Sequence, residues 1–313
     1  MIKFNKKTGG KTFLFAIILD IGVQIVLSVV LSGIVLSGGY SSVGEIPGYS
    51  TINLAVMLIL QGAFVVALIV HKPQLFPTQK RSFARVAADV LIAIAIAFVC
   101  LCCFSWAGEW FSVLLDAIGY KASGLEINGA VDLVLCVIAT VIVAPVVEET
   151  LFRGVMTNEY SRRHGEAATV LLSGLSFALM HMNPAQTVYQ FMLGCACAYM
   201  LIKTRDFIVP VVVHATGNAA AIALNYVDWE IIKPQEGRVS VLLNNPALSV
   251  PITLLLAAAG AAIIYFTGKA LGKKQAAVSF NYDKGGEEKI SCVFAIGICA
   301  VMWIVGLISG CMA

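Results

Sequence analysis

Long apolar stretches separated by short polar segments are the dominant pattern of this chain. Nine stretches are candidate membrane spans, and most of them have the roughly 18 residues or more that cross a bilayer as a helix. They cover residues 12–36, 51–70, 86–106, 131–156, 167–182, 185–202, 207–226, 246–268 and 291–311. The pattern predicts an all-α, polytopic integral membrane protein with about nine transmembrane helices.

The composition agrees with this interpretation. Hydrophobic residues make up 59% of the chain and charged residues only 12%, whereas a soluble domain has roughly 25% charged residues. The charge is therefore too scarce to cover a water-facing surface. The nine cysteines all lie in the apolar stretches, where a cysteine behaves mostly as a small hydrophobic residue, so they do not indicate a metal site.

Basic residues gather in alternate loops. They precede the first span and follow the second, fourth, sixth and eighth spans: Lys3, Lys6, Lys7, Lys11, Lys72, Lys80, Arg81, Arg85, Arg162, Arg163, Lys203, Arg205, Lys269, Lys273 and Lys274. The positive-inside rule then places the N-terminus in the cytoplasm and the C-terminus outside, and we expect the plasma membrane. Since this loop bias accounts for the net charge of +3, no nucleic-acid partner is predicted; membrane lipid is.

The spans divide into three regions of one membrane-embedded chain, without a soluble domain. Residues 1–126 form an N-terminal region of about three spans, residues 127–228 a central region of about four, and residues 229–313 a C-terminal region of about two. The central region stands apart because its spans contain most of the polar side chains that suggest chemistry.

The fourth span carries three ionisable residues at membrane depth, where such groups are costly and usually functional. Glu149 and Arg153 are four residues apart, so they share a helix face and can form an ion pair. Glu148 is rotated by about 100° from Glu149 and points elsewhere. We therefore predict a structural role for Glu149 and Arg153 and a chemical role for Glu148. Pro145 is expected to loosen the helix just before this point.

Two further spans bring polar side chains to one face each. Phe177 and His181 share a face of the fifth span, and His214 and Asn218 share a face of the seventh. If these faces meet that of Glu148, one glutamate, two histidines and an amide surround a small buried space. Depths of about 13 to 22 Å from the cytoplasmic loops, at about 1.5 Å per residue, place this site in the cytoplasmic half or near the middle of the membrane.

Such a set of side chains suits the hydrolysis of a peptide bond. Glu148 can act as a general base on water, and His181 can orient or activate that water. His214 and Asn218 can donate hydrogen bonds to the developing oxyanion. Alternatively, Glu148, His181 and His214 form the three-ligand set of a catalytic zinc with an open water position. No His-Glu-x-x-His helix requires zinc, so both mechanisms stay open.

The ordered motifs of these spans resemble those of the CPBP family, also called Abi. They are Glu148-Glu149-x-x-x-Arg153, Phe177-x-x-x-His181 and His214-x-x-x-Asn218. The family includes type II CAAX prenyl endopeptidases, bacteriocin-processing proteins and bacteriocin self-immunity proteins. The resemblance implies an all-helical intramembrane protease core, either a zinc metalloprotease or a metal-free glutamate-dependent protease. It also implies catalytic roles for Glu148, His181, His214 and Asn218, with Glu149, Arg153 and Phe177 in support.

We therefore expect an intramembrane endopeptidase that cleaves a membrane-associated, prenylated or leader peptide. The prenylated substrate follows from the resemblance alone, since a fold does not fix a function. One alternative is a scaffold or self-immunity protein that binds a partner without cleaving it. Another is a transporter that uses Glu148 and the histidines as a proton relay, although no internal repeat supports it. None of these patterns specifies an oligomeric state.

Asp20, Gln24, Gln61 and Asp89 are also polar residues within the first three spans. We interpret all four as structural pairs or interfacial residues, with Asp89 paired to Arg85.

Overall fold

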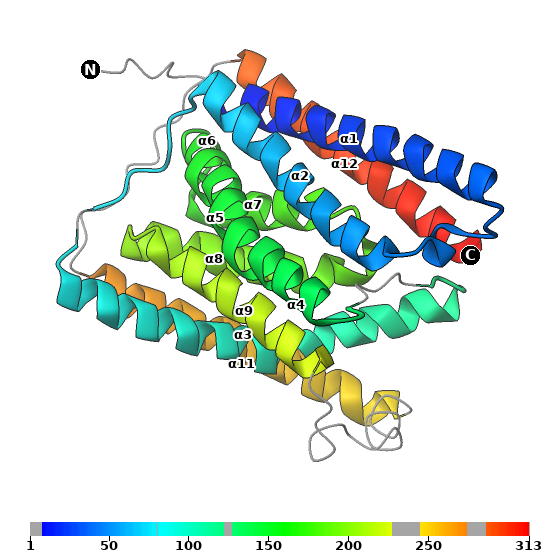
Figure 1. Cartoon of the computed structure of the whole chain (residues 1–313). Helices are drawn as coiled ribbons and strands as arrows, with labels where there is room; N and C mark the ends of the chain where they lie inside the picture. Colours follow the sequence, from blue (N-terminus) through cyan, green and yellow to red (C-terminus); the bar gives the residue numbers. More distant parts are fainter. Residues whose placement is uncertain (1–7, 80, 122–126, 227–244, 274–285, 313) are drawn as a thin grey trace.

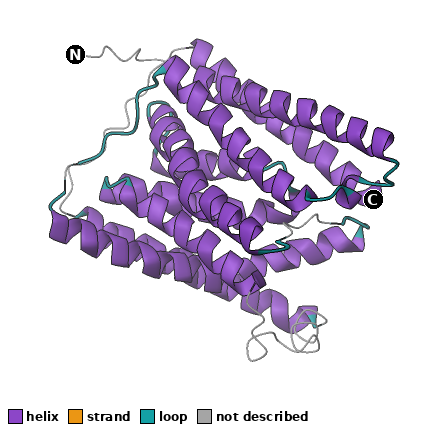
Figure 2. Ribbon diagram, in the orientation of Figure 1, coloured by secondary structure: helices purple, strands orange, loops and turns teal. Residues whose placement is uncertain are grey.

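A computed structural model describes residues 8–79, 81–121, 127–226, 245–273 and 286–312 (Figure 1). Within these ranges the chain forms helices and connecting loops, and no β-strand (Figure 2). The predicted all-α class is confirmed. Four basic residues used for the orientation in the first two loops, Lys3, Lys6, Lys7 and Lys80, lie outside the described residues, as does Lys274.

Seven helices of the described chain are long and apolar enough to cross a membrane. They are α1 (Gly9–Gly38), α2 (Tyr49–His71), α3 (Phe83–Ala117), the segment Ala130–Ser161, the segment Pro184–Thr204 that contains α8 (Thr187–Thr204), α11 (Pro246–Gly272), and Ile290–Met312 within α12 (Gly286–Met312). Two shorter apolar helices are α7 (Glu166–Met180) and α9 (Ile208–Tyr226). Each of the nine predicted spans overlaps one of these segments, which confirms a polytopic membrane protein.

Helix α7 is shorter than the span predicted over 167–182. Its 15 residues rise only about 22 Å, whereas the hydrocarbon core of a bilayer is about 30 Å thick. The helix alone is therefore shorter than that core, and His181 is the residue that follows its last turn. The short helix thereby places a polar side chain inside the bundle.

The segment Ala130–Ser161, called the central span below, is a helix widened at two places. Its regular parts are α4 (Ala130–Cys136), α5 (Ala144–Glu149) and α6 (Thr157–Ser161). Between them lie π-helical stretches at Val137–Val143 and Thr150–Met156. Such stretches occur frequently at functional sites. The predicted loosening near Pro145 takes this form.

The remaining helices flank the central region on two sides (Figure 1). Helix α1 packs against α2 and α12, and α3 packs against α9 and α11. The first side buries a cluster that includes Phe13 of α1, Phe152 of the central span and Phe177 of α7. The N-terminal and C-terminal spans thus each contribute to both sides, and the central region lies between them.

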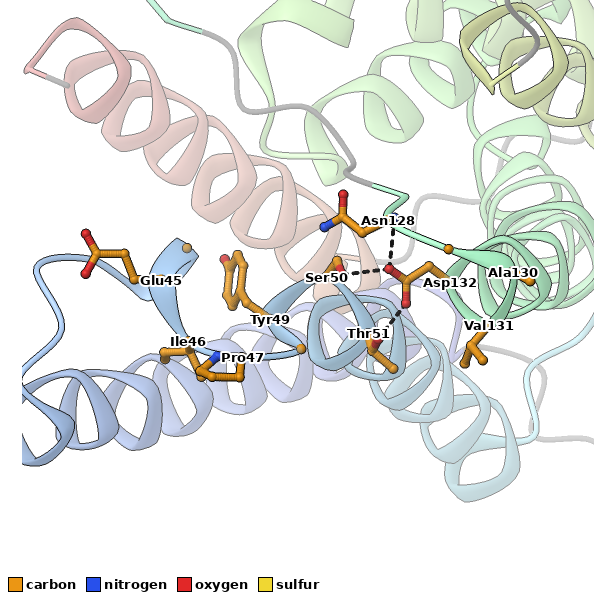
Figure 3. A pocket seen from close by; sticks show the side chains of 13 residues that line it. Glu45, Ile46, Pro47, Tyr49, Ser50, Thr51, Asn128, Ala130, Val131 and Asp132 are labelled. Atoms are coloured by element: carbon orange, nitrogen blue, oxygen red, sulfur yellow. Dashed lines mark hydrogen bonds between the residues drawn. The ribbon is translucent and has the colours of Figure 1, made fainter.

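Helix α2 runs alongside the central span in the same direction. Near the start of both helices, Ser50 donates a 2.6 Å hydrogen bond to the carboxylate of Asp132, which lines a polar pocket and also accepts from Thr51 and the backbone of Asn128 (Figure 3). Near the far end of the central span, the amide of Asn158 donates to the backbone oxygen of Gln74, just past the end of α2, at 2.7 Å. These contacts hold two spans from different parts of the sequence in a fixed register.

Candidate active site

Glu148 of α5 faces His181 across a short gap. Their Oε2 and Nε2 atoms are 4.0 Å apart, and the side chains are 8% and 18% exposed. Nδ1 of His181 lies 2.8 Å from the backbone oxygen of Phe177. Because a carbonyl only accepts, Nδ1 carries the proton, and Nε2 of the neutral ring is left as an acceptor. A buried carboxylate oxygen and a ring nitrogen, both hydrogen-bond acceptors, therefore face each other at 4.0 Å.

A second glutamate–histidine couple lies deeper. Glu149 contacts Nε of Arg153 through Oε2 at 3.0 Å and Nδ1 of His214 through Oε1 at 3.0 Å. The Glu149 and Arg153 side chains are 0% exposed and that of His214 is 2% exposed. The predicted ion pair is present. His214 was expected beside Glu148, and the structure places it on Glu149 instead, because α9 packs along the face of the span that carries Glu149.

Phe177 joins the two couples. Its ring centroid lies 4.7 Å from that of His181 and 5.5 Å from that of His214, both in edge-on geometry. The guanidinium carbon of Arg153 is 4.2 Å from the same centroid. Phe177 is fully buried, so this one ring fixes the spacing between the two histidines and the buried cation.

Asn218 holds the widened part of the central span. The backbone N–H of Ala144 bonds to the oxygen of Ala139, five residues earlier. In that register the oxygen of Thr140 would need the N–H of Pro145, which proline lacks. The Asn218 amide supplies the missing donor at 2.7 Å. The structure thus brings Asn218 to the backbone before Glu148, rather than to the carboxylate.

The proposed zinc ligands do not form a ligand set as the structure places them. Within the part of the chain that the structure describes, no three His, Cys, Asp or Glu side chains gather into a group that would hold a metal ion. Glu148 and His181 form one couple, whereas His214 is directed at Glu149. The geometry does not fit a zinc held by Glu148, His181 and His214.

Sequence reasoning missed one direct partner of Glu148. Gln61, which we had interpreted as a structural residue, donates from Nε2 to Oε1 of Glu148 at 2.6 Å. Asp20 also interacts electrostatically with Glu148 and accepts a 2.7 Å hydrogen bond from Gln24. One feature of the sequence could have indicated this contact: Gln61 is a polar residue in an apolar run and has no polar partner one turn away on its own helix.

The predicted pairing of Asp89 is present. Nε of Arg85 lies 3.1 Å from Oδ1 of Asp89, at the start of α3. A buried carboxylate is thus matched by a cation one helical turn away, as the interpretation of this residue as a structural pair requires.

The region of the chain that contains the candidate site is similar to known proteins. Residues 130–220 match the family model of the Rce1-like type II CAAX prenyl endopeptidases. A relative named CAAX prenyl protease 2, from Caenorhabditis elegans, is 26% identical over 103 residues, which cover 27% of this chain and 39% of the relative. The chain therefore aligns with well under half of that protein. No solved structure matches the chain.

The matched range begins at the start of α4 and ends within α9. It contains all three motifs, from Glu148 to Asn218, and both glutamate–histidine couples. Residues 130–220 of this membrane protein are therefore similar to the Rce1-like type II CAAX prenyl endopeptidases, the protease branch to which the motifs pointed.

Proposed function

We propose that the chain is an intramembrane endopeptidase in which Glu148 and His181 activate a water molecule. The observation that carries the proposal is the 4.0 Å separation between Oε2 of Glu148 and Nε2 of His181. Both atoms are acceptors, so a water between them can donate one hydrogen to each. The deeper couple of Glu149 and His214 is almost excluded from solvent, which leaves Glu148 and His181 as the pair that substrate can reach.

The reaction requires one proton to move through Glu148. The water oxygen attacks the carbonyl carbon of the scissile bond while its proton passes to the Glu148 carboxylate. The tetrahedral intermediate then collapses, the carbon–nitrogen bond breaks, and the proton on Glu148 passes to the leaving amine. Glu148 returns to its ionised form, and no other group changes its protonation state.

The remaining predicted site residues hold this couple in place. Phe177 packs against the His181 ring, and Arg153 and His214 fix Glu149, the neighbour of Glu148 in α5. Asn218 supports the widened helix through Thr140. We assign these four residues positioning roles, since none of the hydrogen bonds they make within the described residues reaches Glu148.

We infer that the substrate is a peptide cleaved at the membrane. The name of the Caenorhabditis elegans relative supports a prenylated C-terminal peptide as the substrate class. A leader peptide without a prenyl group is the other class that the buried site accommodates. The two classes differ in lipid modification, which a peptide panel separates directly.

We also propose that the site opens toward the cytoplasm of a cell whose plasma membrane holds the chain. The loops predicted to be cytoplasmic gather at one end of the bundle. The backbone N–H of Gln79 donates to the oxygen of Arg205 at 2.9 Å, and Lys203 pairs with Glu166 at 2.6 Å. This gathering supports the alternation of loops on which the orientation rests.

Cleavage of a quenched-fluorescent peptide panel, prenylated and unprenylated, by the purified protein in detergent tests the proposal. Glu148→Gln should abolish cleavage, whereas the matched variant Glu109→Gln, at an exposed position of α3, should cleave as wild type does. Equal cleavage by wild type and Glu148→Gln would overturn the assignment. Cleavage by wild type should survive a zinc chelator; loss that added zinc restores would replace the glutamate mechanism with a metal mechanism.

A further inference from the structure

Helix α2 lies outside the residues that match the family model, yet it contributes to the site. The match begins at residue 130, and α2 ends at His71. From this helix, Gln61 donates a 2.6 Å hydrogen bond to Oε1 of Glu148. Gln61 is 9% exposed and Glu148 6% exposed, so little water competes for this contact.

The hydrogen bond divides the two oxygens of Glu148 between two tasks. Oε1 accepts from Gln61, whereas Oε2 is buried and has no hydrogen-bond partner within the described residues. Oε2 is the oxygen that faces Nε2 of His181. A carboxylate held at one oxygen loses rotation about its last bond, so the free oxygen keeps its direction toward the histidine.

The backbone that carries Gln61 is fixed to the helix that carries Glu148. Ser50 donates a 2.6 Å hydrogen bond to Asp132, and these two residues precede Gln61 and Glu148 along their helices. After it, the N–H of Phe76 donates to the oxygen of Gly154 at 2.7 Å. The amide therefore reaches Glu148 from a helix that cannot shift independently along the central span.

We propose that Gln61 is a positioning residue that orients the Glu148 carboxylate for its role as base. This inference rests on the proposed peptidase function, because it assigns Glu148 the role of base. It extends the active site to a helix outside the residues that match the family model. Gln61 acts through Glu148 and makes no contact with the scissile bond.

Gln61→Met tests the proposal, since methionine keeps the length of the side chain and removes the donor. We expect kcat to fall about tenfold to a hundredfold, the effect of losing a hydrogen bond to a charged group, while KM changes little. The control is Asn53→Leu, which removes an amide about two turns earlier on the same helix and should leave both constants unchanged. Unchanged kcat in Gln61→Met would overturn the proposal.

A second measurement does not depend on catalysis. A hydrophobic carbodiimide modifies protonated carboxyl groups, and mass spectrometry after digestion reports the extent at Glu148. At one fixed pH, Gln61→Met should label several times faster than wild type and Asn53→Leu, because Oε1 of Glu148 has lost the amide that holds and covers it. Equal labelling in all three proteins overturns the role of Gln61. A wild type that cleaves no peptide but shows the labelling difference refutes the peptidase proposal alone.

Discussion

Nδ1 of His214 lies 3.0 Å from Oε1 of Glu149, at a depth where both side chains are almost fully buried. The second oxygen of the same carboxylate lies 3.0 Å from Nε of Arg153. Glu149 is thus held between a guanidinium and an imidazole that come from two helices. The arrangement balances a buried positive charge inside the bundle, which supports the structural role proposed for Glu149.

Glu149→Gln should destabilise the protein strongly. The substitution keeps the size of the side chain but leaves the guanidinium of Arg153 buried without its counter-charge. Breaking a buried pair in this way costs about 3–5 kcal/mol. The free energy of unfolding, measured by denaturant titration in mixed micelles, should fall by that amount.

The matched control is the same change one residue earlier. In Glu148→Gln the lost carboxylate has neutral partners, the Gln61 amide and a His181 ring that carries its proton on Nδ1. The free energy of unfolding should therefore change by no more than about 1 kcal/mol, while cleavage is lost. Equal destabilisation of the two variants would contradict the division between a structural and a chemical glutamate.

Phe177→Leu should weaken both the fold and the site. Leucine retains apolar volume but removes the ring that lies 4.2 Å from the Arg153 guanidinium and 4.7 Å from the His181 ring. We expect a loss of about 2 kcal/mol in unfolding free energy and a lower kcat, since His181 loses its packing partner. The comparison is Phe98→Leu, at a ring that is 53% exposed. Similar losses in both variants would show that Phe177 acts only as a hydrophobic residue.

The order of the helices was predictable from the sequence because it follows from apolar length. The π-helical stretches were not. The widened turn before Glu148 depends on Asn218 donating to Thr140, 78 residues away, and no local pattern contains that contact. Pro145 indicated that the helix would be perturbed there, but not that a distant amide would supply the hydrogen-bond donor that proline lacks.

The candidate site divides in the same way. Glu149 and Arg153 are four residues apart, so helix geometry alone predicted their ion pair. The partner of Glu148 is 87 residues away on α2, and the partner of Glu149 is 65 residues away on α9. Which polar face meets which depends on the packing of the helices. The sequence analysis therefore grouped His214 with Glu148, whereas the structure pairs it with Glu149.

Gly194→Ala should disrupt the contact between α7 and α8. A Cβ at Gly194 would lie 2.8 Å from Cα of Gly174, and backbone cannot move aside cheaply at such a distance. The oxygen of Gly194 also accepts a 3.4 Å hydrogen bond from Arg153, so separation of the helices disturbs the buried charge. We expect a loss of about 1–3 kcal/mol in unfolding free energy.

The control for this variant is Gly33→Ala in α1, where no atom lies within 4 Å of the added Cβ. Alanine has the higher helix propensity, so this variant should be as stable as wild type or more stable by up to about 1 kcal/mol. Denaturant titrations of the two variants side by side separate steric contact from propensity. A Gly194→Ala protein as stable as Gly33→Ala would show that α7 and α8 are not so close.

Gly306→Ala should impair catalysis from the C-terminal span. A Cβ at Gly306 of α12 would lie 2.9 Å from the backbone oxygen of Met182. Met182 follows His181 and has a φ of 51°, a left-handed conformation that is unfavourable for a residue with a side chain. The turn has little freedom to adjust, so the added methyl group should displace His181 from Glu148.

Gly297→Ala is the matched control, since it lies on the same helix and its Cβ would meet no atom within 4 Å. We expect kcat to fall several-fold in Gly306→Ala and to match wild type in Gly297→Ala, with protein levels and unfolding free energy measured for both. Loss of stability without loss of kcat would show that α12 contributes to packing and not to the position of His181. Wild-type behaviour in both respects would mean that α12 does not approach the turn. A selective fall in kcat would show that the histidine depends on a helix outside the residues that match the family model.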